Sequence, residues 1–140
     1  SWTPPRRPLA QAPEPGLPLA HAPIPVVPAA PPARQDGAQA ALRHIAALAD
    51  QGRVQDAMAQ CRAHIDSHGA SAEALYLQGL LQDAAGDARQ AQAAYRKALY
   101  LDPTHREALL HLAALVASDG DHEAARRLQA RAARGEVRRG

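Results

Sequence analysis

The chain has 140 residues and a formal net charge of +2, so it is long enough for one folded domain with a tail, and its weak basicity does not by itself indicate nucleic acid as a partner. Hydrophobic residues make up 46% of the sequence but aromatic residues only 3%, and alanine supplies much of the apolar fraction, which favours closely packed helices over strands. The single cysteine, Cys61, excludes an internal disulfide framework and indicates a reducing compartment, so we expect a cytoplasmic protein.

Residues 1–35 are predicted to be a disordered, proline-rich interdomain linker. Residues 1–33 contain 11 of the 12 prolines, and proline fixes φ and removes the amide donor, so neither a helix nor a sheet can propagate there. A ligand for a proline-binding domain is the alternative interpretation. Nowhere does the sequence contain a run of about 18 apolar residues, so we expect no membrane insertion.

Residues 36–140 are predicted to form a helical domain, because only Pro103 interrupts this part of the chain. Three capping boxes are predicted, at Asp36 with Gln39, Asp87 with Gln90, and Thr104 with Glu107, and single caps at Ser71 and Asp121. The predicted helices span residues 37–50, 54–67, 72–85, 88–101, 105–118 and 122–134.

Glycines recur in this region with a fixed period. Gly52, Gly86 and Gly120 are separated by steps of 34 residues, and alanines follow five places after each of them. A period of 34 residues is typical of a helix–turn–helix repeat. The sequence therefore predicts three repeats, residues 38–71, 72–105 and 106–139, in an all-α superhelix.

The middle unit resembles the tetratricopeptide (TPR) repeat. The positions that carry the resemblance are Leu75, Gly79, Gly86, Asp87, Ala91, Tyr95, Ala98 and Pro103. Gly79 and Ala91 are small where the two helices of a unit cross, and Tyr95 fills the space against the next unit. The third unit matches at Leu109, Leu112, Ala113, Gly120, Asp121, Ala125 and Ala132, whereas the first departs at His64 and Gly69. Terminal repeats are often atypical.

No catalytic or cofactor-binding motif occurs in the sequence. Cys61, His64 and His68 share one helical face at a spacing compatible with a metal ion, but the repeat alignment directs Cys61 and His64 into the helix packing. We therefore expect no metal site, no cofactor and no catalytic residue in this chain.

A concave protein-binding groove is the expected functional site, since stacked repeats line such a groove with the first helix of each pair. An apolar floor with an acidic rim would suit an amphipathic helix or peptide carrying basic charge. The carboxylate-binding mode of many TPR domains is not expected, because Glu107 would repel the ligand. The alignment places twelve residues in the groove, namely Gln39, Leu42, Ala46, Asp50, Glu73, Tyr76, Leu80, Asp83, Glu107, Leu110, Ala114 and Ser118.

A narrower resemblance rests on the stretch RKALYLDPTHREALLHLA, residues 96–113, and on the closing RLQARAAR. Both are similar to the C-terminal TPR segment of CheR-type bacterial chemoreceptor methyltransferases, including those of Wsp-type surface-sensing pathways. The resemblance implies a linker that joins this segment to an S-adenosylmethionine-dependent catalytic domain, which the chain lacks. It also implies a protein partner, either a cytoplasmic segment of a chemoreceptor or the enzyme's own catalytic domain. A stand-alone TPR adaptor in protein assembly or secretion is the alternative.

Overall fold

The computed structural model describes residues 1–3 and 32–139, and the side chains of residues 36–135 within the second range. Most of the predicted linker, and with it the predicted disorder, lies outside the described residues. Residues 33–140 form one compact unit.

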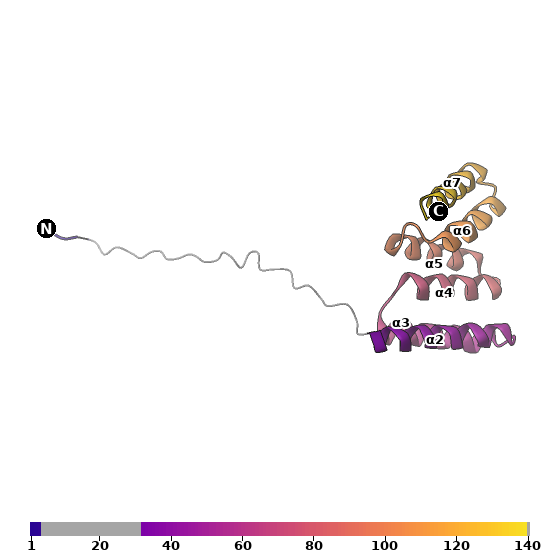
Figure 1. The fold of residues 1–140 in the computed structure, drawn as a ribbon, viewed down its shortest axis with the longest axis horizontal. Coiled ribbons are helices and arrows are strands. Elements are labelled where there is room, and N and C mark those ends of the chain that lie inside the picture. The colour runs from indigo at the N-terminus through magenta and orange to yellow at the C-terminus, as the bar shows by residue number, and fades with distance from the viewer. Residues whose placement is uncertain (4–31, 140) are drawn as a thin grey trace. The chain divides into compact units, whose positions relative to one another are not determined.

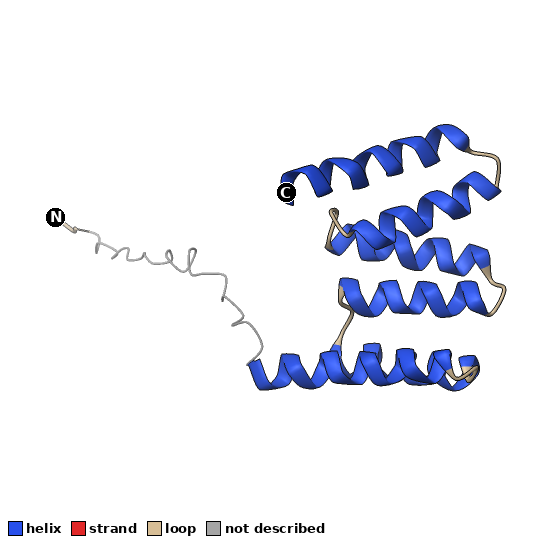
Figure 2. Ribbon diagram, turned by 45° about the vertical axis from the view of Figure 1, so that its right-hand side comes forward, coloured by secondary structure: helices blue, strands red, loops and turns tan. Residues whose placement is uncertain are grey.

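The described residues contain six helices and no strand (Figure 2). Successive helices run in opposite directions and stack from α2 and α3 at one end to α7 at the other (Figure 1). The predicted all-α repeat fold is therefore confirmed. The helices are α2 (Pro32–Asp50), α3 (Val54–His68), α4 (Ala72–Ala84), α5 (Ala88–Leu101), α6 (Arg106–Ser118) and α7 (His122–Arg139).

The turns inside the repeats depend on the periodic glycines. Gly52, Gly86 and Gly120 have φ angles of 83°, 87° and 95°, in the left-handed region that residues with a Cβ atom rarely adopt. Each of these glycines lies between the two helices of one unit, so the 34-residue period of the sequence is the period of the structure.

Three of the predicted N-caps are confirmed. Ser71 accepts a hydrogen bond from the amide of Ala74, and the carboxylates of Asp87 and Asp121 do the same for the amides three residues later.

Two predicted N-caps are wrong. Asp36 lies inside α2, which begins at Pro32, because proline needs no amide partner in the first turn of a helix. At α6 the cap is His105 and not Thr104. The carboxylate of Asp102 accepts hydrogen bonds from both the amide and the hydroxyl of Thr104. The Thr104 hydroxyl is therefore engaged outside the helix, and His105 caps α6 instead. The last helix also extends to Arg139, five residues beyond the predicted end at 134.

The core consists of two clusters that share partly buried residues. One contains residues of α4, α5, α6 and α7 around Tyr95 and Leu109. The other contains residues of α2, α3 and α4 around Ile45 and Leu81. Ile65 and Leu80 pack against both clusters, so the apolar core runs through the whole stack.

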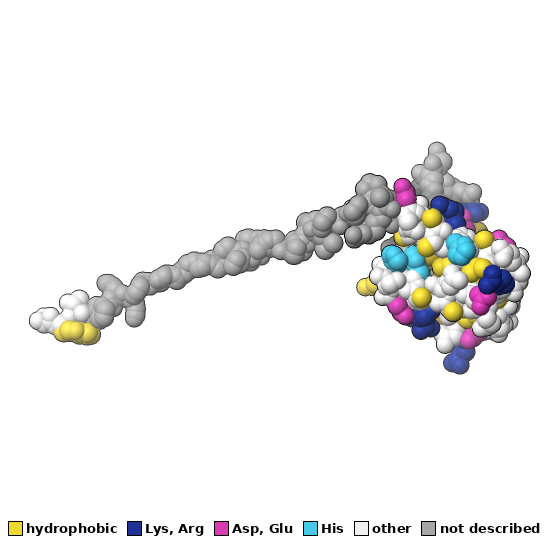
Figure 3. Space-filling model, turned by 90° about the horizontal axis from the view of Figure 1, so that it is seen from below, with side chains coloured by type: hydrophobic (Ala, Val, Ile, Leu, Met, Phe, Trp, Pro, Cys, Tyr) yellow, Lys and Arg dark blue, Asp and Glu magenta, His cyan; other side chains and the backbone are white. Residues whose placement is uncertain are grey.

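The two atypical residues of the first unit, Gly69 and His64, both have defined contacts. Gly69 ends α3 with a φ of 86°, and its amide donates to the carbonyl of Ile65. His64 is buried and stacks on His68 with ring centroids 4.5 Å apart. Seen from the α2–α3 end, histidine side chains and small hydrophobic areas lie among charged groups (Figure 3). Burial lowers the pKa of His64 below its ordinary value of 6.5, and His68 lowers it further.

This shift predicts a loss of stability in mild acid. Because the pKa of His64 is lower in the folded chain than in the unfolded chain, the unfolded chain binds more protons below about pH 6.5. The free energy of unfolding is therefore expected to decrease as the pH falls below that value. Urea unfolding of the parent and of His64→Leu between pH 7.5 and pH 5 measures the effect. The variant should lose part of the pH dependence, and the exposed His122→Gln should keep it. An identical dependence in His64→Leu would contradict the assignment.

Candidate functional site: a groove between the first helices of the repeats

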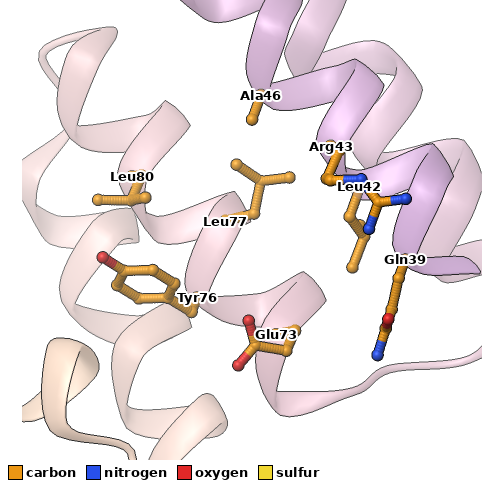
Figure 4. Close-up of a pocket in the computed structure, with 8 residues that line it drawn as sticks. All are labelled: Gln39, Leu42, Arg43, Ala46, Glu73, Tyr76, Leu77 and Leu80. Carbon is orange, nitrogen blue, oxygen red and sulfur yellow. The ribbon is translucent and has the colours of Figure 1, made fainter.

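A cleft of about 550 Å³ lies between α2 and α4, the first helices of the first two repeats (Figure 4). Six of the twelve predicted groove residues line it, together with two that the alignment did not include, Arg43 and Leu77. Its lining consists of Gln39, Leu42, Arg43, Ala46, Glu73, Tyr76, Leu77 and Leu80.

The cleft has an apolar floor and a rim of mixed charge. Leu42 and Leu77 lie between the two helices, while Gln39 and Glu73 lie at the same end of the cleft on opposite helices (Figure 4). Arg43 adds a positive charge where the alignment predicted an acidic rim. Such a surface can bury apolar side chains of a bound segment and can pair with polar groups of either sign at the edge.

Tyr76 connects this cleft to the next first helix, α6. Its ring lies 4.8 Å from that of His105, 5.6 Å from that of His111 and 5.9 Å from that of Tyr95, centroid to centroid. Neither histidine was predicted as a site residue. These contacts hold the half-buried Tyr76 side chain in place, and a pre-oriented aromatic ring loses little entropy when a ligand packs on it.

His105 fixes the geometry beside Tyr76 through both ring nitrogens. Its Nδ1 accepts a hydrogen bond from the amide of Ala108, and its Nε2 lies 2.9 Å from Oε1 of Glu73. This network assigns the proton to Nε2, which donates to the carboxylate. Glu107 lies 3.7 Å from Nδ1. The buried His105 ring therefore links α4 to α6 and lies next to Glu73 and Glu107, two of the predicted rim carboxylates.

The two tyrosines of this region stay protonated. Burial raises the pKa of Tyr76, and Glu107 and Glu73 raise it further. Burial also raises the pKa of Tyr95 strongly, with Asp83 and then Tyr76 adding to the effect. The Tyr76 phenol can therefore donate a hydrogen bond to a ligand, while the hydroxyl of Tyr95 has no partner among the described residues.

The other six predicted residues do not line the cleft. They lie at the end of α2, at the end of α4 and along α6, and all are exposed except the half-buried Leu110. This set consists of Asp50, Asp83, Glu107, Leu110, Ala114 and Ser118. Glu107 alone is tied to the cleft electrostatically, through its effect on Tyr76.

Cys61 is fully buried, and its Sγ donates to the carbonyl oxygen of Ala74 at 3.7 Å. Burial raises its pKa to about 11, so the thiol is not ionised near neutral pH. Within residues 36–135, no three His, Cys, Asp or Glu side chains are grouped so as to hold a metal ion.

The described part of the chain contains no helix that is long and apolar enough to span a membrane.

Comparison with known proteins identifies relatives of the sequence. The chain is 57% identical over 91 residues to "Probable biofilm formation methyltransferase WspC" of Pseudomonas aeruginosa, a match that covers 65% of this chain and 22% of that protein. It is 46% identical over 127 residues to the protein of the same name in Pseudomonas putida, covering 87% of this chain and 30% of that protein. The chain thus spans less than a third of the length of these curated relatives. No family model matches the sequence.

The fold has a solved counterpart in MamA, with a TM-score of 0.67 and 22% sequence identity over 73% of this chain and 60% of that one. The described helices therefore have the fold of a tetratricopeptide repeat superhelix. The predicted resemblance of the domain to the Wsp-type methyltransferases is likewise confirmed by the two relatives.

Proposed function

We propose that this TPR domain is a protein–protein interaction module, the C-terminal domain of a chemoreceptor glutamate methyltransferase that acts in chemosensory signalling in the cytoplasm. In this proposal the catalytic domain belongs to the longer enzyme, and the TPR domain positions that enzyme on its receptor or regulates it. Support comes from the two methyltransferase relatives, which are much longer than the matched region.

The observation that carries the proposal is the cleft between α2 and α4. Its floor leaves apolar groups of two helices open to a ligand, and Tyr76 is held at its edge by three ring contacts. An apolar cleft with few polar groups at its rim is suited to a helix or an extended peptide, which anchors itself by two or three side chains.

Isothermal titration calorimetry of the 140-residue chain tests this function. The titrants are the cytoplasmic segment of the chemoreceptor that the proposed enzyme methylates and, separately, the isolated catalytic domain of that enzyme. We expect one of the two to bind with a negative heat-capacity change, because apolar surface becomes buried. Absence of heat and of complex formation with both titrants would contradict the proposal.

A further inference from the structure

A second cleft, of about 530 Å³, lies between the second helices of two neighbouring repeats, α5 and α7, above side chains of α6. It shares no lining residue with the cleft between α2 and α4. Its lining consists of Arg96, Leu99, Tyr100, Leu112, Val116, Ala124, Arg127, Leu128 and Arg131.

Three arginines line this cleft, and none of the described residues that line it is acidic. Arg96 and Arg131 donate to neutral oxygens, the amide of Gln92 at 3.3 Å and the carbonyl of Pro103 at 3.1 Å. The nearby carboxylate of Glu123 pairs with Arg126, which does not line the cleft. Among the described residues, therefore, none of the three lining arginines forms an ion pair.

The floor and one edge of the cleft are apolar. Leucine and valine side chains of α5, α6 and α7 form the floor, and Tyr100 lies at the edge with 86% of its surface exposed. The adjacent Leu101 is 49% exposed. An aromatic residue this exposed, beside arginines on both flanking helices, makes the surface amphipathic.

We propose that the cleft between α5 and α7 is a second protein-binding surface, and that it takes an acidic amphipathic helix. Apolar side chains of that helix pack on the leucine floor and against Tyr100. Its carboxylates pair with Arg96 on one wall and with Arg127 and Arg131 on the other, since guanidinium groups bind carboxylates in a fixed geometry. A protein fits better than a nucleic acid, because Tyr100 is the one aromatic side chain at the cleft and single-strand binding needs several. The proposal does not depend on what binds between α2 and α4.

The test uses the ¹⁵N-labelled 140-residue chain and three designed peptides of roughly four helical turns. All carry the same leucine stripe, flanked by glutamate, glutamine or lysine. The glutamate peptide is expected to bind at least about tenfold more tightly than the glutamine peptide, and more weakly as salt is added. Its chemical-shift changes should centre on Arg96, Tyr100 and Arg127.

Replacing Arg96 and Arg127 by Glu should abolish the preference for the glutamate peptide. Arg126→Glu, a charge reversal outside the cleft, should retain that preference. Circular dichroism verifies that both variants are folded. Equal affinity for the three peptides would overturn the inference, as would shift changes confined to α2 and α4. Tighter binding of a single-stranded oligonucleotide or of vesicles containing phosphatidylglycerol would also overturn it, in favour of a phosphate-binding face.

Discussion

Replacing Tyr76 and Leu80 together by alanine is expected to lower the affinity of the groove for its protein partner by about 100-fold or more. Truncating a central aromatic or aliphatic anchor commonly costs ~2 kcal/mol or more, and each 1.4 kcal/mol is tenfold in affinity. Both side chains are half-buried and line the cleft, so they can bury further surface against a ligand. Calorimetry with the receptor segment and the catalytic domain measures the loss.

Two controls separate lost binding from lost folding. Tyr100→Ala removes an equally large side chain from the cleft between α5 and α7, and should leave binding at the groove unchanged. Ala46→Arg fills the groove without removing any packed side chain, and should weaken binding as the double variant does. If both groove variants bind with the parental affinity, the surface between α2 and α4 is not the recognition site.

Gly79→Ala is expected to destabilise the domain by ~1–3 kcal/mol, as overpacking of a core does. A Cβ atom at Gly79 would meet the ring of Tyr95 closer than carbon atoms approach one another. Tyr95 is fully buried and contacts the rings of Tyr76 and His111, so it cannot move aside without displacing them. Thermal unfolding should show a melting temperature lower by several degrees.

Gly37→Ala is the matched control, because nothing lies within 4 Å of a Cβ atom there and Gly37 is in the exposed part of α2. Alanine at that site should leave the melting temperature unchanged or raise it slightly. Tyr95→Leu should lower the free energy of unfolding less in the Gly79→Ala variant than in the parent, because it removes the ring that clashes with the new Cβ atom. Additive effects would show that the ring does not limit the size of residue 79.

The repeat architecture was predictable from the sequence because its determinants are local. A glycine in the left-handed region at 52, 86 and 120 and a short polar cap at 71, 87 and 121 can each be recognised without knowledge of the fold. The cap at His105 was not predictable, because histidine has no strong preference for that position. What holds the ring there is Glu73, 32 residues earlier in the chain.

The candidate site was predictable only in part. The alignment assigns a residue to the groove by its place in the repeat, and six of those it selected line one cleft. Arg43 and Leu77 were missed since their inclusion depends on how α2 and α4 are inclined, which no periodicity specifies. The ring contacts of Tyr76 with His105 and His111 join residues about 30 places apart, and such contacts depend on the superhelical packing of neighbouring repeats.

The most direct test of the proposed function is a ¹⁵N NMR titration of this chain with its receptor segment and with the catalytic domain. If the groove between α2 and α4 is the recognition site, the largest shift changes should fall on the amides of Leu42, Ala46, Leu77 and Leu80. They should vanish in the Ala46→Arg variant. Binding of a partner with shift changes only elsewhere in residues 36–135, or no shift change with either protein, would contradict the account.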